Sequence, residues 1–214
     1  EPPYQAAIHG LVRAIPEQVS LFIPQDISNS LNALSKWPIS IQETPYKEAI
    51  CHLTTIIPEK IAKFHAREIA NALNALSKWP ISIHEPPYQA AIQALVRTIP
   101  EQASLFIPQG INNSLNALSK WPISVHETPY QEAIHSLMAT ILKQVNTFSM
   151  RDIAGMLNAL SKWPISTHAS PYQETIQALV RAIPQQVKLF TAQNISNSLN
   201  ALAKWVALFK KIIY

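Results

Sequence analysis

The sequence contains little cysteine and little glycine for a chain of 214 residues. Cys51 is its only cysteine, so no disulfide framework can form. A reducing compartment, the cytoplasm or an organelle matrix, is therefore expected, and no secretory signal peptide is visible in the sequence. Only three glycines are present, whereas there are 17 prolines. The turns are therefore expected to use proline rather than glycine to end the elements.

Charged residues and long apolar runs are also scarce. Charged side chains make up 14% of the chain, whereas about a quarter is usual. The surface must therefore be rich in Asn, Gln, Ser and Thr. The formal net charge of +4 permits a polyanionic partner without requiring one. No apolar run approaches the roughly 20 residues needed to span a bilayer, so no membrane partner is expected.

Internal repetition dominates what the sequence does contain. Residues 31–38 read Leu-Asn-Ala-Leu-Ser-Lys-Trp-Pro, and this phrase returns from Leu73, Leu115 and Leu157 and, altered, from Leu199. Five tryptophans and six tyrosines each recur at a step of 42 residues. A fixed period of this length is typical of a stacked array of units that share one elongated core. We expect a single array with units at residues 3–44, 45–86, 87–128, 129–170 and 171–214, the last with an atypical end.

Each unit is predicted to begin with a helix. In the first unit, Tyr4, Ile8, Leu11 and Ile15 recur at helical spacing and form one apolar face. A Pro-Tyr step starts the helix, and a preceding hydroxyl residue can cap it, as at Thr44, Thr128 and Ser170. A proline is expected to close or kink this helix in four units, at Pro16, Pro58, Pro100 and Pro184, whereas the fourth unit has Leu142.

A second helix is predicted to start at residue 23 or 24 and to face the core with Ile27, Leu31 and Leu34. It should stop near Lys36, because the following tryptophan precedes a proline and is pushed toward extended geometry. Pro24 and Pro108 fit the first turn of this helix, and residues 149–152 resemble a capping box. An extended linker at residues 38–41 would join the next unit. The fold class is all-α, with two helices per repeat, and the tryptophans are core wedges.

An α-helix turns by about 100° per residue. This rotation places Gln25, Asn29, Asn32 and Lys36 on the side of the second helix opposite the core, where they form a polar stripe. Small residues flank the stripe and would let neighbouring second helices approach closely. Two columns of the stripe do not vary and are predicted to contact an RNA backbone, at Asn32, Lys36, Asn74, Lys78, Asn116, Lys120, Asn158, Lys162, Asn200 and Lys204.

The other positions of the stripe are predicted to read bases, because amide, guanidinium and carboxylate groups pair with the edges of unstacked bases. These residues are Gln25, Asp26, Asn29, Arg67, Glu68, Asn71, Gln109, Gly110, Asn113, Arg151, Asp152, Gly155, Gln193, Asn194 and Asn197. Gly155 is the one member that breaks the column of Asn29, Asn71, Asn113 and Asn197. Two structural alternatives stay open. The Asn32 column could bond the next linker, and the lysine column could complement the helix dipole.

No residue pattern predicts catalysis or a metal site. His84, His126 and His168 form a linker column, but each lacks the Cys or carboxylate companions that a metal site needs. Cys51 and His52 adjoin in sequence in one unit only, whereas a nucleophile dyad requires spatial pairing and an orienting third group. No Gly-rich phosphate loop and no paired catalytic carboxylates are present. We expect no enzyme activity and no cofactor.

Residues 22–36 resemble the second helix of octotricopeptide repeat proteins and are also similar to the helical repeats of FAST-kinase-like organellar RNA proteins. The family's features are a phenylalanine, a Pro/Ala-Gln start, an apolar residue, Ala/Ser-Asn and a closing Leu-x-Ala-Leu-Ala-Lys. A similar stretch recurs in all five units, with serine in place of the last alanine in four of them. The resemblance implies a right-handed α-solenoid, a superhelix of five helix-turn-helix repeats. It also implies sequence-selective binding of single-stranded RNA on the concave face, at about one nucleotide per repeat.

Two other functions remain open. The first is a protein-binding or peptide-binding scaffold similar to armadillo repeats, which also span about 42 residues and use an asparagine ladder to hold an extended peptide. The second is a structural spacer without a ligand. RNA binding should depend steeply on salt, because phosphate contacts release counterions, whereas peptide binding by amides should depend on it little. The sequence does not predict the oligomeric state.

Overall fold

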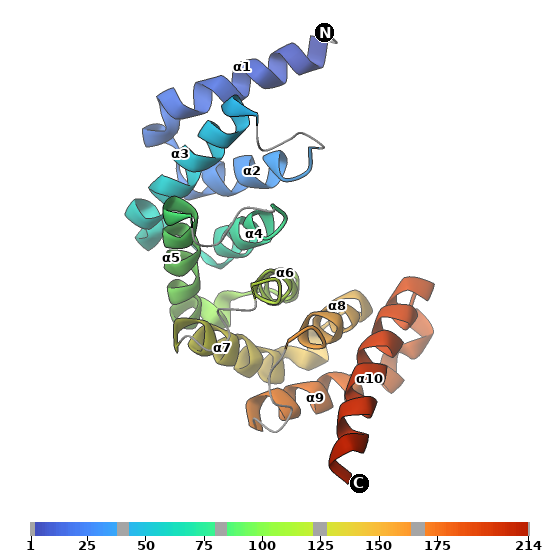
Figure 1. The fold of residues 1–214 in the computed structure, drawn as a ribbon. Coiled ribbons are helices and arrows are strands. Elements are labelled where there is room, and N and C mark those ends of the chain that lie inside the picture. Colours follow the sequence, from blue (N-terminus) through green and yellow to red (C-terminus); the bar gives the residue numbers. More distant parts are fainter. Residues whose placement is uncertain (1–2, 38–42, 80–84, 122–127, 164–169, 214) are drawn as a thin grey trace. The chain divides into compact units, whose positions relative to one another are not determined.

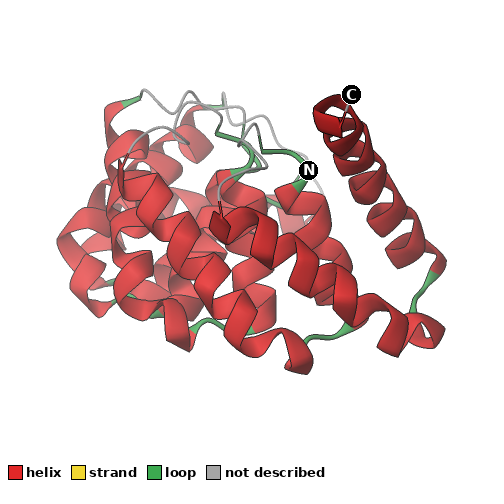
Figure 2. Cartoon of the chain, turned by 90° about the horizontal axis from the view of Figure 1, so that it is seen from below, coloured by secondary structure: helices red, strands yellow, loops and turns green. Residues whose placement is uncertain are grey.

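The computed structural model describes residues 3–37, 43–79, 85–121, 128–163 and 170–213. Within these ranges the chain forms ten α-helices and no strand (Figures 1 and 2). The helices are α1 (Pro3–Gln18), α2 (Pro24–Leu34), α3 (Thr44–Lys60), α4 (Ala66–Leu76), α5 (Pro86–Gln102), α6 (Pro108–Leu118), α7 (Thr128–Gln144), α8 (Met150–Leu160), α9 (Ser170–Gln186) and α10 (Ala192–Ile213). The predicted linkers at 38–41 and the histidines at 84, 126 and 168 lie outside the described residues.

Each repeat forms a hairpin of a longer and a shorter helix, as the 42-residue period predicts. The connection is a three-residue 3-10 helix followed by an extended phenylalanine, such as Phe148 with φ −76° and ψ 138°. These 3-10 helices are η1 (Val19–Leu21), η2 (Ile61–Lys63), η3 (Ala103–Leu105), η5 (Val145–Thr147) and η6 (Val187–Leu189). The extended phenylalanine turns the chain back without the left-handed backbone that glycine would supply, and no described residue has a positive φ.

The prolines in the first helices do not set where those helices end. Pro16, Pro58 and Pro100 lie inside the last turns of their helices, which continue for two more residues. Helix α7 has Leu142 at this position and still ends at the equivalent residue, Gln144. The prediction was that proline closes or kinks the helix; closing was therefore wrong, and the kink stays a prediction. The 3-10 segment and the extended phenylalanine end the helix in the first four repeats.

The capping prediction for the first helices was wrong by one residue. Helix α3 begins at Thr44 itself, and Glu43 occupies the N-cap with an extended backbone of φ −69° and ψ 128°. The Glu43 carbonyl accepts bonds of 3.1 Å from the N–H groups of Tyr46 and Lys47. Pro45 is consequently the second helical residue, where its missing N–H still costs nothing. Thr128 and Ser170 are likewise the first residues of α7 and α9.

The second helices begin and end where the sequence predicts. Helix α2 starts at Pro24 and ends at Leu34, and the N–H groups of Ser35 and Lys36 bond back to Leu31 and Ala33 at 2.9 and 3.0 Å. Helix α10 is the exception, since it runs through Trp205 to Ile213. Val206 replaces the proline that follows the other four tryptophans, so nothing forces the backbone out of the helix there.

The chain divides into two compact units, residues 1–98 and 99–214, and the division falls inside α5. In the first unit α1 packs against α3, and α2 packs against both α4 and α3. In the second unit α7 packs against α9, while α8 lies between α6 and α10 and also contacts α9. Within each unit, helices two places apart along the chain therefore pack against each other, which is the arrangement of stacked helical hairpins.

The apolar faces predicted from the sequence are buried inside the array. Ile27, Leu31 and Leu34 of α2 are buried, as are the equivalent residues of α4, α6 and α8. The predicted face of the first helix is also buried in α3, for example at Tyr46 and Leu53. Helix α1 differs, because Tyr4 and Leu11 are largely exposed. The helical spacing of α1 was right, but the spacing does not show whether a face is buried, because burial depends on the neighbouring hairpin.

Tryptophan and tyrosine side chains connect successive hairpins by packing and by hydrogen bonds. Four of the five tryptophans are buried, and Trp37 is half-buried, which agrees with their predicted packing role. The Tyr172 hydroxyl donates a hydrogen bond to the carbonyl of Leu160 in the preceding hairpin. Burial raises the pKa of Tyr172 to about 12, and a hydrogen bond with Trp205 partly opposes this shift. The phenol is therefore a neutral donor at physiological pH and ties α9 to the end of α8.

No helix in the described ranges is both long enough and apolar enough to cross a membrane.

Candidate nucleic-acid interface

The polar stripe of the second helices consists of exposed lysines beside half-buried asparagines. The side chains of Lys36, Lys78, Lys120, Lys162 and Lys204 are all exposed. The asparagine four residues earlier is half-buried in α2, α4, α6 and α8, and Asn200 of α10 is exposed. Lys204 lies inside α10, whereas each of the other four lies two residues beyond the last residue of its second helix. The second helices pack side by side within each unit. In each unit the lysines therefore form a row of cations, with one lysine per hairpin.

Two of the lysines reach back to the preceding second helix. The Lys162 ammonium donates a hydrogen bond of 3.1 Å to Oδ1 of Asn116. The Lys78 ammonium lies 3.5 Å from Oγ of Ser35, at the outer limit of a hydrogen bond. The lysine row therefore also links neighbouring helices. Both partners are neutral, so these contacts leave the positive charge of the lysines uncompensated.

The charges within a row influence one another. Burial against the preceding helix lowers the pKa of Lys78, and the nearby Lys36 ammonium lowers it further. Burial likewise lowers the pKa of Lys162, and Lys204 adds to the effect. Like charges held close together raise each other's free energy. An anion that follows the row would relieve this repulsion, which is the electrostatic property of a polyanion site.

The first variable position of each stripe points toward solvent. Gln25, Arg67, Gln109, Arg151 and Gln193 are all exposed at the N-terminal ends of the second helices. Exposed amide and guanidinium groups at a helix N-terminus retain their full hydrogen-bonding capacity. These five side chains are therefore available to a ligand that lies along the second helices.

The second variable position has a structural role in three of the repeats. A carboxylate oxygen of Asp26 accepts the N–H of Ile23 at 3.1 Å, and Glu68 accepts that of His65 at 3.3 Å. Asp152 accepts the N–H of Ser149 at 3.1 Å and belongs to the predicted capping box. These carboxylates satisfy the N-cap groups of their own helices. The sequence interpretation recognised this capping only for Asp152.

The remaining residues of that second column differ again. Gly110 is buried in α6. Asn194 is half-buried, and its backbone N–H donates a bond of 3.2 Å to the Thr191 hydroxyl, which caps α10. The residues at this second variable position therefore mainly reflect how the N-terminus of each second helix is capped.

Gly155 departs from the asparagine column for a reason of packing. A Cβ atom added there would lie 2.5 Å from Nδ2 and 2.7 Å from Oδ1 of Asn112 on α6. Other hairpins have serine or alanine at the position of Asn112 and asparagine at the position of Gly155. Between α6 and α8 the asparagine therefore lies on the earlier helix and the small residue on the later one, which is the reverse of the arrangement in the other hairpins. Asn112 is the residue that sequence reasoning missed, and its signal was the paired exception in two adjacent columns.

The flanks of the stripe otherwise carry small residues, as predicted. Ser28 and Ser114 are buried at the contacts between helices. Small side chains allow helix backbones to approach closely, and this explains how the second helices pack side by side.

Residues that could support other chemistry do not come together. Within the residues that the structure describes, no group of three or more His, Cys, Asp or Glu side chains could hold a metal ion. Cys51 is a free thiol and is exposed on α3. His52 is also exposed on this helix. Neither observation adds a catalytic or cofactor site to the stripe.

No known family model matches the chain, and the search of curated proteins found no match. The resemblance to octotricopeptide repeats therefore stays a prediction.

Proposed function

We propose that this chain binds single-stranded RNA along the polar stripes of its second helices. The observation that carries the proposal is the row of exposed lysines, one per hairpin, in which burial and then a neighbouring ammonium group lower the pKa of Lys78 and of Lys162. A flexible polymer with one charge per unit matches a row of this kind. Double-stranded nucleic acid fits less well, because its bases are already paired and stacked.

The proposal gives the two parts of each stripe separate roles. The lysines hold phosphates and position the strand. The exposed residue near each helix start, such as Arg67 or Gln109, faces a base and sets the preference at that place. In this proposal the hairpins form a right-handed superhelix with the second helices on its inner face. About one nucleotide is read per hairpin.

Peptide binding through an asparagine ladder is the second candidate, but one contact weighs against it. Oδ1 of Asn116 already accepts a hydrogen bond from Lys162. An asparagine ladder needs free amides to bond a peptide backbone. Bound peptide would therefore have to compete with the lysine of the next hairpin.

The salt dependence of affinity for RNA tests the proposal. We expect the triple variant Lys78→Ala, Lys120→Ala, Lys162→Ala to bind a labelled mixed-sequence RNA of about 12 nucleotides at least about tenfold more weakly at low salt. A hydrogen bond to a charged group contributes about 1 kcal/mol or more. The slope of log K against log salt should flatten by about 2, because each lost phosphate contact removes about 0.7. Fluorescence anisotropy measures both quantities.

A charge-matched control separates a specific row from general attraction. Lys47, Lys63 and Lys143 are exposed but lie in first helices or in a 3-10 connection, away from the ends of the second helices where the row lies. Changing these three to alanine removes the same charge and should leave the affinity within about threefold of wild type. If the two triple variants lose affinity equally, RNA binding is not organised by the second helices. Wild-type binding that does not change with salt would favour the peptide alternative.

A further inference from the structure

The exposed residue near the start of each second helix alternates between two kinds along the chain. It is the second residue of its helix in every hairpin, and the five members in chain order are Gln25, Arg67, Gln109, Arg151 and Gln193. Glutamine therefore returns every two hairpins, and so does arginine. The alternation is present within each compact unit taken by itself, since the first unit has one residue of each kind and the second has Gln-Arg-Gln.

The tip of each hairpin alternates in the same way, four residues before this position. Leu21, Leu105 and Leu189 are 65–75% exposed in the first, third and fifth hairpins. The second and fourth hairpins have Lys63 and Thr147 at the equivalent position, and both side chains are exposed. Each glutamine therefore follows an apolar tip, whereas each arginine follows a polar one.

The N-cap residues add to this difference in the first four hairpins. Ile23 and Ile107 precede α2 and α6 and are 56% and 61% exposed. His65 and Ser149 precede α4 and α8 and are also exposed. In the fifth hairpin Thr191 takes this place, so that hairpin keeps only the apolar leucine. Two kinds of surface therefore follow each other along the second helices.

The two kinds of surface match the chemistry of two different bases. A glutamine amide can bond to N6 and N7 of adenine, and an arginine guanidinium can bond to O6 and N7 of guanine. Guanine carries more polar groups at its edges than adenine does, and polar groups that lose water need new partners. An apolar tip beside an amide therefore suits adenine, whereas a polar tip beside a guanidinium suits guanine.

We propose that RNA bound along the second helices is read in steps of two nucleotides, with adenine facing each glutamine hairpin and guanine facing each arginine hairpin. This inference rests on the proposed binding of single-stranded RNA and adds the base preference. Bases in a strand of alternating adenine and guanine alternate in both directions, so the expected preference is the same for either polarity of the bound strand. The lysine row contributes an affinity that all sequences share.

Fluorescence anisotropy with labelled RNAs of about 12 nucleotides measures the preference of the wild type. We expect alternating adenine–guanine RNA to bind at least about tenfold more tightly than alternating adenine–cytosine or uracil–guanine RNA at the same salt concentration. The reason is that each well-placed bidentate pair discriminates against a wrong base by about fivefold or more. Alternating uracil–cytosine RNA should bind most weakly.

Exchanging the arginines for glutamine should convert one kind of hairpin into the other. The double variant Arg67→Gln, Arg151→Gln should bind all-adenine RNA at least about fivefold more tightly than alternating adenine–guanine RNA. The wild type should show the opposite order. Both residues are exposed, so the circular dichroism spectrum should remain that of the wild type.

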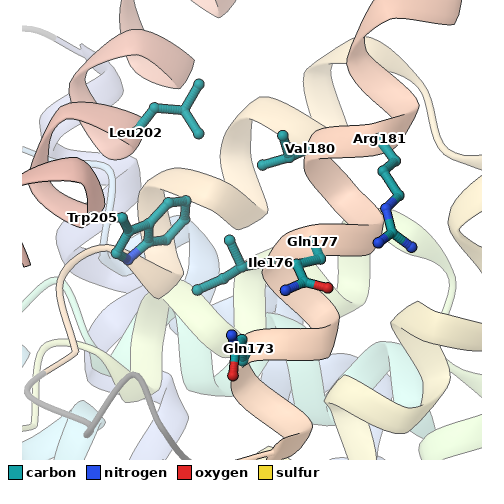
Figure 3. Close-up of a pocket in the computed structure, with 7 residues that line it drawn as sticks. All are labelled: Gln173, Ile176, Gln177, Val180, Arg181, Leu202 and Trp205. Atoms are coloured by element: carbon teal, nitrogen blue, oxygen red, sulfur yellow. The ribbon is translucent and has the colours of Figure 1, made fainter. Parts of the chain in front are cut away.

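The matched control changes one arginine of a first helix in each unit. Arg97 lies on α5 and Arg181 on α9, and both are exposed. Arg181 lines the pocket between α9 and α10 that Figure 3 shows. The double variant Arg97→Gln, Arg181→Gln removes the same charge and should keep the wild-type order of RNAs.

The outcomes separate this inference from the proposed function. If the wild type binds all the RNAs equally and its affinity still falls steeply with salt, the base assignment is wrong and RNA binding stands. If no RNA binds, both are wrong. Tighter binding of uracil–guanine than of adenine–guanine RNA, or an equal change of preference in the two double variants, would overturn the assignment of bases to these residues.

Discussion

Replacing Phe148 with alanine is expected to lower the free energy of unfolding by about 3–5 kcal/mol, because the side chain is almost fully buried. Phe148 follows the 3-10 helix η5 and leads into α8, where its extended backbone reverses the chain. Its loss leaves a cavity at the point where the two helices of the hairpin join. Urea unfolding monitored by circular dichroism measures the effect.

The equivalent phenylalanine of the first hairpin is an internal control. Phe22 occupies the same position but is only half-buried. We expect Phe22→Ala to cost clearly less than Phe148→Ala, because less apolar area is removed from the core. If the two substitutions cost the same, the cost arises from the local turn rather than from burial between hairpins.

Replacing Gly155 with asparagine, the residue at the equivalent position of the other hairpins, is expected to destabilise the chain by about 1–3 kcal/mol. The new Cβ would lie within 2.8 Å of three side-chain atoms of Asn112. Either Asn112 must leave its place or α6 and α8 must separate. Glycine is a poor helix former, so an isolated helix would gain from this substitution. A measured loss of stability therefore reports the contact between helices.

The double variant Asn112→Ala, Gly155→Asn should restore most of that stability. It recreates the small-and-asparagine pair that Ala154 and Asn197 provide between α8 and α10. Asn112→Ala also removes a buried amide oxygen that has no hydrogen-bond partner. A double-mutant cycle should show a coupling energy of about 1–2 kcal/mol. Additive losses in the double variant would show that Gly155 is not matched to Asn112.

The repeat period predicted most of the fold because each position is sampled several times along the chain. The boundaries of α2 and the burial of Ile27 and Leu31 followed from helical spacing and from the proline after Trp37. Features that become clear only from a repeat that differs from the others were harder to predict. The end of α7 shows that the proline in the other first helices was not the stop signal, since Leu142 replaces it without changing the helix end.

The candidate site was predictable in position but less so in detail. The 100° spacing placed the lysines opposite the core, and they are exposed. It did not show that Asp26 and Glu68 bond to their own N-cap groups, because a carboxylate near a helix start serves equally well for capping and for binding. It also did not show that Tyr4 is exposed, because burial depends on the neighbouring hairpin and not on the repeat itself.

The most direct test of the central claim is to map where RNA touches the chain. Photocrosslinking of RNA that contains 4-thiouridine, followed by mass spectrometry of the peptides, locates the contacts. We expect the crosslinks to fall in the second helices, within residues 66–79, 108–121 and 150–163. Crosslinks concentrated in the first helices, within residues 44–60 and 128–144, would contradict the account.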